Sequence, residues 1–288
     1  MPRDGPRRWV SCPDYWTRSW PRPSWVSGPR GLGRGHHLGP TACLHFRMSK
    51  AQVDRLGDRL RFGVPSEADL RELNDFRQSF APAYQEAVEL IRARLGVDPT
   101  GRPAKSTTAI MEKLRRESVR LSQIQDIAGA RIVVANSNDQ DEVVDQLGKL
   151  FQRVTVVDRR QKPSHGYRAV HVIPGIRDTP VEVQVRTDLQ HHWAELSEKL
   201  SDLIDPSIKY GGGSESLREA LLSSSATIAS IERVEVGVAK LEVRASEEGH
   251  DLQAEINELR ADLQTAGVMA HAELDRLFVD IRTLAGGA

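Results

Sequence analysis

The sequence has few cysteines, no long apolar run and no excess of charge of either sign, and each absence excludes a class of protein. Its two cysteines, Cys12 and Cys43, stand near the beginning, so neither a disulfide framework nor a thiolate metal cluster is available. No stretch approaches the roughly 20 apolar residues that span a bilayer. Forty basic residues balance forty acidic ones, which excludes a strongly basic nucleic-acid-binding chain. We expect a cytoplasmic protein without membrane contact.

The composition of the chain changes at Met48. Residues 1–47 hold four of the five tryptophans and many arginines and prolines, but neither lysine nor glutamate. One interpretation is an arm whose arginines and tryptophans contact the phosphates and bases of a nucleic acid. The other is a disordered or non-native extension, too rich in proline and glycine to fold and translated from upstream of the true start. We favour the second, with Met48 as the natural initiator.

Apolar periodicity predicts helices on both sides of the middle of the chain. Acidic residues follow Ser66, as at many helix starts, and apolar residues then recur every three or four positions as far as Leu95. Pro82 is expected to kink or divide this helix. Further helices are expected over residues 107–118, 139–151 and 189–203.

Four runs rich in β-branched residues predict strands, at residues 130–135, 154–157, 167–173 and 181–186. Their order among the helices indicates an α/β (α+β) fold, with one mixed sheet flanked by helices. The last two runs predict an antiparallel hairpin, because they are separated by a turn that contains proline, glycine and aspartate.

The two strands of this hairpin place polar side chains together. In residues 181–186 valine alternates with Glu182, Gln184 and Arg186, so these three side chains share one face while the valines fill a core. By the same period Tyr167, Ala169 and His171 are expected to share a face of the partner strand. Such a surface suits a flat base and phosphates, although any half-exposed strand shows the same alternation.

The chain after the glycine-rich segment 210–214 is expected to be helical throughout. A short heptad stripe runs from Leu252 to Leu263 and favours a helical hairpin packed on its own domain or on another subunit. We therefore predict four parts. They are the extension 1–47, a helical region 48–100, the mixed-sheet domain 101–210 and a helical region 214–288.

Two motifs in the hairpin point to a known family. Residues 166–171 read Gly-Tyr-Arg-Ala-Val-His, and residues 181–187 read Val-Glu-Val-Gln-Val-Arg-Thr. In this order and spacing they resemble the paired signature of the RelA/SpoT synthetase domain, whose members make the alarmones ppGpp and pppGpp. The resemblance extends from about Lys105 to Leu200. It implies a nucleotidyltransferase-like fold and a small alarmone synthetase, which moves the β,γ-pyrophosphate of ATP onto the 3′-hydroxyl of GDP or GTP in stringent-response signalling.

The resemblance also implies a magnesium site. Residues 125–132 read Gln-Asp-Ile-Ala-Gly-Ala-Arg-Ile and are similar to the family strand whose aspartate binds Mg²⁺, here Asp126. The glutamate of the second hairpin strand, Glu182, is expected to bind the metal or to activate the attacking hydroxyl. Carboxylates together with substrate phosphates are the usual ligands of Mg²⁺. We expect Glu182 to lie at a solvated site.

Basic residues are expected to bind the donor nucleotide. Lys105 and Lys113 match family lysines that face the ATP phosphates, where lysine acts as a point charge. The family arginine that stacks on adenine is replaced by Pro103, and we expect Arg102 to take its place. Arg131 is a further candidate for the phosphates of ATP.

The acceptor nucleotide is expected to meet the hairpin. By resemblance Tyr167 stacks on guanine, His171 contacts the ribose or phosphates, Gln184 orients the acceptor and Arg186 contacts phosphate. Three positions depart from the family pattern: Pro163 stands in place of lysine, His165 in place of asparagine and Glu198 in place of histidine. His165 is retained as a candidate contact for the acceptor.

Three functions stay open at this point. The first is alarmone synthesis, and the second keeps the chemistry but uses the 3′ end of tRNA as acceptor, as some toxic relatives do. The third is a catalytically weak nucleotide-binding regulator whose C-terminal helices bind a partner. The resemblance also implies a homo-oligomer formed through the terminal helices, with which the apolar stripe from Leu252 to Leu263 is compatible.

Overall fold

The computed structural model describes residues 48–248 and 252–286, all of whose elements lie in the unit Ser49–Ala288. The predicted extension 1–47 lies outside the described residues. The helices are α1 (Lys50–Phe62), α2 (Glu67–Gln78), α3 (Ala81–Leu95), α4 (Thr107–Arg116), α5 (Ser137–Leu150), α6 (Asp188–Leu203), α7 (Glu215–Glu248) and α8 (Gln253–Gly286), with short 3-10 helices η2 (Leu121–Gln123) and η3 (Ile208–Tyr210). The strands are β1 (Thr100–Arg102), β2 (Ala128–Val134), β3 (Val154–Asp158), β4 (Val170–Ile176) and β5 (Thr179–Thr187).

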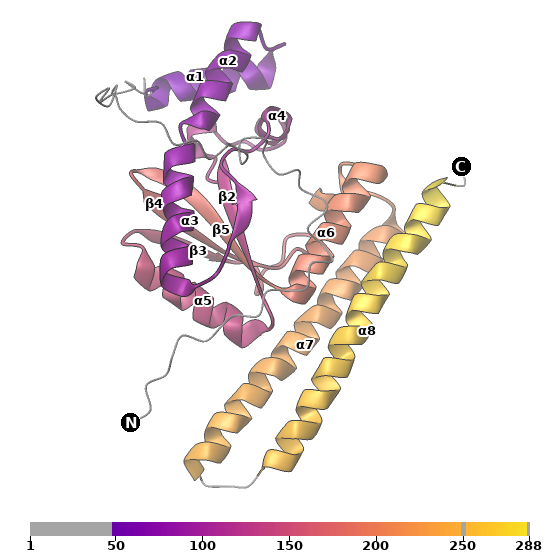
Figure 1. Cartoon of the computed structure of the whole chain (residues 1–288). Helices are drawn as coiled ribbons and strands as arrows, with labels where there is room; N and C mark the ends of the chain where they lie inside the picture. The colour runs from indigo at the N-terminus through magenta and orange to yellow at the C-terminus, as the bar shows by residue number, and fades with distance from the viewer. Residues whose placement is uncertain (1–47, 249–251, 287–288) are drawn as a thin grey trace, which may run out of the picture. The chain divides into compact units, whose positions relative to one another are not determined.

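The strands form one mixed sheet in the order β1-β2-β5-β4-β3 (Figure 1). β2 and β5 are parallel, and the other neighbours are antiparallel. The predicted mixed sheet flanked by helices is therefore confirmed. The predicted β4–β5 hairpin is confirmed too, and it closes through Arg177 and Asp178, whose φ angles of 51° and 63° are those that tight hairpin turns require.

The prediction that Tyr167 and Ala169 belong to a strand is wrong. β4 begins only at Val170, because the chain before it turns sharply. His165 and Gly166 have φ angles of 54° and 91°, and the amide of Tyr167 donates to the carbonyl of Ser164 over 2.9 Å. Strand alternation therefore cannot place Tyr167 on the face that carries His171.

Pro82 divides the predicted N-terminal helix into α2 and α3. It occupies the first turn of α3, where its missing N–H removes no helical hydrogen bond. Ser66 caps α2 by accepting a hydrogen bond from the amide of Asp69. The short edge strand β1 was not among the predicted strands.

Helices cover both faces of the sheet. α3 and α5 pack against β2, β4 and β5 on one face of the sheet (Figure 1). α6 packs against β2 and β5 on the opposite face, where its Glu195 meets Arg131 of β2. The polar face of β5 therefore lies partly beneath a helix and is not fully open to water.

The two 34-residue helices α7 and α8 form a hairpin beside α6 (Figure 1). Buried residues of all three helices make a second hydrophobic cluster, which includes Trp193, Leu200, Ile228 and Leu274. Burial of this apolar surface holds the hairpin against the sheet domain. The predicted domain limits stay a prediction.

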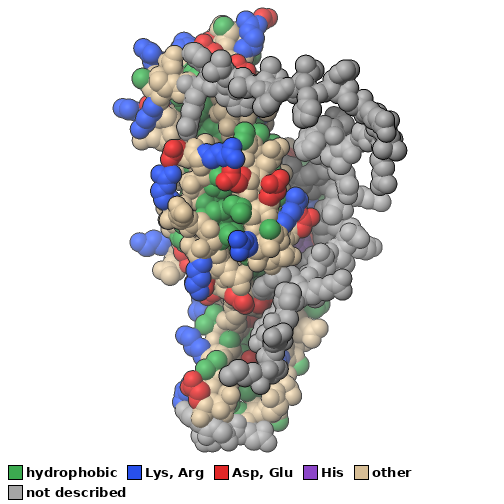
Figure 2. All heavy atoms as spheres, turned by 60° about the vertical axis from the view of Figure 1, so that its left-hand side comes forward, with side chains coloured by type: hydrophobic (Ala, Val, Ile, Leu, Met, Phe, Trp, Pro, Cys, Tyr) green, Lys and Arg blue, Asp and Glu red, His purple; other side chains and the backbone are tan. Residues whose placement is uncertain are grey.

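The surface shows no concentration of one charge on the face seen in Figure 2, where basic and acidic side chains are interspersed around a central group of hydrophobic ones. Among residues 48–248 and 252–286, no helix combines the length and the apolar character that crossing a membrane requires.

Candidate active site

The sheet register brings five of the eleven predicted site residues together in two rows on one face. Directly paired residues of neighbouring strands project to the same side of a sheet. Two adjacent rows of paired residues cross this face. They are Arg102, Gly129 and Glu182 in one row, and Arg131, Gln184 and His171 in the next.

Asp126, directly before β2, binds both predicted donor lysines. Lys105 Nζ lies 2.5 Å from Asp126 Oδ2, and Lys113 Nζ, from α4, lies 3.0 Å from Asp126 Oδ1. Burial by itself would raise the pKa of Asp126, but the two ammonium groups outweigh it and hold the pKa at about 2. The aspartate is therefore ionised at any working pH, and three predicted residues form one charged cluster.

Glu182 is buried, and the expectation of a solvated site is wrong. Only 8% of the residue is exposed. Its Oε1 lies 2.8 Å from His171 Nδ1, and its Oε2 accepts a hydrogen bond from Gln184 Nε2 over 2.7 Å. Burial favours the neutral acid, yet the contact with His171 outweighs it, so that the pKa of Glu182 is lowered. The carboxylate is held in place by these two neighbours.

A hydrogen-bonded relay leads from Arg186 to Glu182 by two routes. Arg186 Nη2 donates to Tyr167 Oη over 3.0 Å and to Gln184 Oε1 over 2.7 Å. Tyr167 Oη lies 2.9 Å from His171 Nε2. Because Nδ1 of His171 faces an ionised carboxylate, it carries the proton, and Nε2 then accepts from the tyrosine hydroxyl. Arg186 thus orients His171 and Gln184, and both hold Glu182.

A pocket of about 160 Å³ opens beside these groups, between α4, η2 and the β3–β4 part of the sheet. Its polar lining includes Lys113, Asp126, His171, Glu182 and Arg159. Val157 and Ile173 supply apolar floor, since Val157 pairs with His171 in the sheet register. Two cations, an imidazole and three carboxylates, the third being that of Glu117, therefore face one cavity.

Sequence reasoning missed Arg159. It directly follows β3, and its amide donates to the carbonyl of Ala169 over 2.9 Å, which ties it to the turn before β4. The signal that predicts Arg159 is its position just after the predicted strand 154–157. That signal becomes visible only when this strand is paired with β4, the strand that carries His171.

Seven of the predicted residues do not line the pocket. Four of them, Lys105, Tyr167, Gln184 and Arg186, are joined to its lining by the hydrogen bonds described above, whereas the other three take no part in those bonds. Arg131 Nη1 lies 2.9 Å from Glu195 Oε1, beneath α6. Arg102 is half-buried in the edge strand. Burial lowers the pKa of Arg77, and the charge of the nearby Arg102 lowers it further. His165 is exposed, and its ring lies against Gly211, where an added Cβ would come within 2.2 Å of Nδ1.

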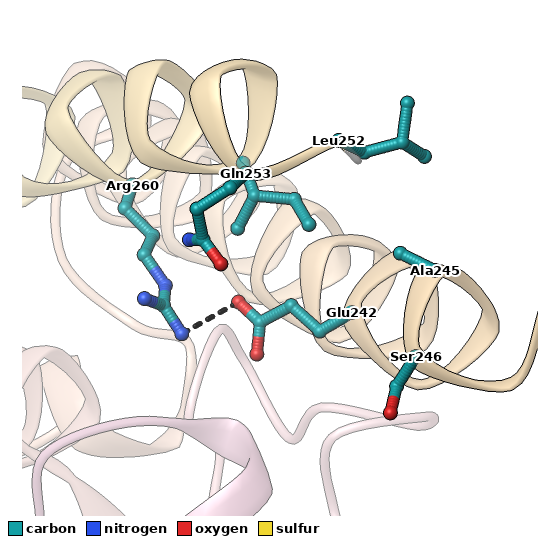
Figure 3. A pocket seen from close by; sticks show the side chains of 7 residues that line it. Glu242, Ala245, Ser246, Leu252, Gln253 and Arg260 are labelled. Carbon is teal, nitrogen blue, oxygen red and sulfur yellow. Dashed lines mark ion pairs between the residues drawn. The ribbon is translucent and has the colours of Figure 1, made fainter. Parts of the chain in front are cut away.

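A larger hollow of about 290 Å³ lies at the far end of the C-terminal hairpin (Figure 3). Side chains of α7 and α8 line it, and Arg260 Nη2 forms an ion pair with Glu242 Oε1 over 2.8 Å there. None of the predicted site residues reaches this hollow. The candidate active site is therefore the pocket on the sheet.

The carboxylates of the pocket fit a magnesium ion. Mg²⁺ is usually held by one or two carboxylates and by substrate phosphates. Asp126 and Glu182 line the same pocket and lie close enough for the charge of Asp126 to act on the pKa of Glu182. Within the described part of the chain, no group of three or more histidine, cysteine or acidic residues could hold a metal ion. The chemistry thus suits a hard cation shared with phosphates.

Comparisons with known proteins point to one family. The family described as "Region found in RelA / SpoT proteins" matches residues 101–201. An uncharacterized protein of Mycobacterium tuberculosis is 34% identical over 186 residues, which cover 60% of this chain and 67% of that protein. The GTP pyrophosphokinase YjbM of Bacillus subtilis is 29% identical over 221 residues, which cover 66% of this chain and 90% of that enzyme.

One solved structure also aligns with this chain, at lower sequence identity than the relatives named above. The crystal structure of small alarmone synthetase 1 from Bacillus subtilis, bound to its product pppGpp, aligns with a TM-score of 0.44 and 25% sequence identity. The alignment covers 58% of this chain and 97% of that protein.

Proposed function

The chain belongs to the RelA/SpoT family, and from that premise we propose that it synthesises alarmones. The reaction transfers pyrophosphate from ATP to the 3′-hydroxyl of GDP or GTP and yields AMP with ppGpp or pppGpp. One observation supports the proposal above all: Asp126, Glu182, His171 and Lys113, which come from the motifs that the resemblance assigns to donor and acceptor, face one pocket. The family relative YjbM is named a GTP pyrophosphokinase. A role in stringent-response signalling follows from this product.

The donor side of the site is built for a triphosphate. Lys105 and Lys113 each bind one oxygen of Asp126 in the structure. A bound ATP would offer these ammonium groups phosphate oxygens that carry more charge than a single carboxylate. Mg²⁺ at Asp126 and Glu182 would supply further neutralisation of the phosphate charge. The two lysines therefore position the β- and γ-phosphates beside the acceptor.

The acceptor side places a hydroxyl next to Glu182. The 3′-oxygen of the acceptor attacks the β-phosphorus of ATP, the bond from that phosphorus to the bridging α,β-oxygen breaks, and AMP leaves with the electron pair. The hydroxyl proton passes to the Glu182 carboxylate. Phosphoryl-type transfer needs positioning and charge stabilisation more than a strong base, so a carboxylate of lowered pKa suffices.

Tyr167→Phe separates the two roles proposed for this side chain. The ring that stacks on guanine stays, so the KM for GDP should change by less than about threefold. The hydroxyl that links Arg186 to His171 is lost, which leaves buried polar atoms unpaired and loosens His171. We expect kcat to fall about tenfold, which corresponds to a loss of about 1.4 kcal/mol of transition-state stabilisation. Steady-state kinetics with varied GDP measures both constants, and a large KM change with constant kcat would contradict the assignment.

The acceptor is tested by offering three candidates to the same protein. The chain is incubated with Mg²⁺ and ATP labelled in the β-phosphate, together with GDP, GTP or purified tRNA. Label on GDP or GTP supports the proposal, whereas label on tRNA alone supports the toxin-like reaction. Nucleotide binding with no transfer to any acceptor supports the regulator and removes the synthetase.

A further inference from the structure

The C-terminal helix α7 contacts the turn that carries Tyr167, although α7 lies outside the matched family region, residues 101–201. Three contacts from one face of α7 reach the segment 164–169 or its support. They come from positions 221, 225 and 232, whose spacing puts them on the same side of a helix. Figure 1 shows α7 running beside α6 at this end of the sheet.

The first two contacts fix Gly166. Ser225 Oγ, which is buried, donates to the carbonyl oxygen of Gly166 over 2.7 Å. An added Cβ on Gly166 would lie 2.7 Å from the indole of Trp193, so the backbone rests directly on that ring. Trp193 Nε1 in turn donates to the carbonyl of Leu221 in α7 over 3.0 Å. A glycine at φ 91° is thus clamped between two helices.

The third contact is a buried ion pair one residue beyond Tyr167. Arg168 Nη2 lies 2.5 Å from Glu232 Oε2, and only 6% of Glu232 is exposed. The other oxygen of Glu232 accepts from Gln190 Nε2, at the start of α6, over 2.6 Å. Arg168 Nη1 also donates to the carbonyl of Arg160 over 2.7 Å. The residues on both sides of Tyr167 are therefore bound to α7. In the donor cluster, by contrast, Asp126 and its two lysines bind one another.

We propose that Glu232 is a positioning residue for the acceptor nucleotide, acting through Arg168, and that Ser225 assists it through Gly166. The inference rests on the proposed function, in which the ring of Tyr167 stacks on guanine. Helix α7 then forms part of the acceptor site without touching the nucleotide. Loss of its contacts should weaken guanine nucleotide binding selectively, because the donor lysines do not depend on α7.

The experiment compares three variants of the full chain, Glu232→Gln, Ser225→Ala and Glu235→Gln. The last is the matched control: it makes the same change on the same helix, but its carboxylate accepts from Ser137 on α5 over 2.9 and 3.0 Å and not from the turn. Calorimetry gives the Kd for GDP and for a non-hydrolysable ATP analogue, and steady-state kinetics gives both KM values and kcat.

We expect Glu232→Gln to raise the Kd and KM for GDP about tenfold or more, because it removes one charge of a buried ion pair and leaves Arg168 without its counter-charge. The Kd and KM for ATP should stay within about twofold. Ser225→Ala should raise the Kd and KM for GDP about threefold, because it removes one neutral hydrogen bond. Glu235→Gln should leave both constants within about twofold of the wild type. Unchanged GDP affinity in both test variants, or equal weakening of both nucleotides, overturns the inference. If Glu232→Gln does not fold in a thermal melt, Ser225→Ala alone decides.

The same data separate failure of the inference from failure of the proposed function. A wild-type protein that makes product, with variants that keep GDP affinity, overturns the inference alone. A wild-type protein that binds GDP but makes no product overturns the proposed function, and a selective loss in Glu232→Gln still supports the positioning role. A wild-type protein that binds no guanine nucleotide overturns both.

Discussion

Glu182→Gln should lower kcat/KM about 1,000-fold or more, which corresponds to about 4 kcal/mol of transition-state stabilisation. The substitution removes the negative charge that the attacking hydroxyl and a bound cation require, while it keeps the shape of the side chain. It also places an amide against Gln184 Nε2, which now donates to the carboxylate over 2.7 Å. Because Glu182 is buried, we expect a small drop in melting temperature in addition to the loss of activity.

Product formation from labelled ATP, together with a thermal melt of the same sample, measures the effect of Glu182→Gln. Glu89→Gln is the control, because Glu89 is exposed on α3, on the other side of the sheet. It should match the wild type in both measurements. Activity within about tenfold of wild type in a folded Glu182→Gln protein would show that another group accepts the proton and binds the cation.

Asp126→Asn should remove both activity and stability. Without the carboxylate, Lys105 and Lys113 face each other with no counter-charge between them. We expect kcat/KM to fall about 100-fold or more, because the substitution removes a metal-binding oxygen and leaves the lysines misplaced.

In the folded protein the pKa of Asp126 is about 2, against 3.8 in a free chain. Its ionised form therefore contributes about 2 kcal/mol to the free energy of unfolding.

The sign of this contribution gives the Asp126→Asn prediction a pH dependence. A carboxylate whose pKa is lowered on folding stabilises the protein above the pKa of the unfolded chain, and this stabilisation disappears as pH falls through the folded value. The difference in unfolding free energy between wild type and variant should thus be full above about pH 4 and vanish near pH 2. Denaturant unfolding at several pH values measures it. Asp145→Asn, which breaks only an exposed pair with Lys149, should show almost no difference.

The hairpin shows what the sequence can predict. Valine alternation in residues 181–186 gives the two faces of β5, because a strand period of two leaves no other arrangement once the valines are buried. The same period predicts that His171 shares a polar face with its hairpin partner, and the structure pairs it with Gln184. Periodicity does not say what covers the polar face. Here α6 and the turn before β4 cover it, so Glu182 and Arg186 are buried. Gln184 lies between them, donating a hydrogen bond to Glu182 and accepting one from Arg186.

The position of Tyr167 shows where local patterns fail. Two residues directly before the predicted strand 167–173, His165 and Gly166, are in left-handed conformation, so the chain enters this segment through a turn. Gly166 packs against Trp193, which is itself bound to helix α7 far along the chain. Glu232 lies 64 residues from the arginine it binds. No local signal in α7 distinguishes this glutamate from its exposed neighbours, because only the tertiary fold brings it to Arg168.

The nucleotide product, identified by mass, tests the central claim most directly. The full chain is incubated with Mg²⁺, ATP and either GDP or GTP, and the mixture is separated and analysed by mass spectrometry, with Glu182→Gln as the parallel control. The account predicts AMP together with a guanosine nucleotide that has gained one pyrophosphate on its ribose, and neither product in the control. A folded wild-type protein that binds ATP and GDP but leaves both unchanged would contradict it.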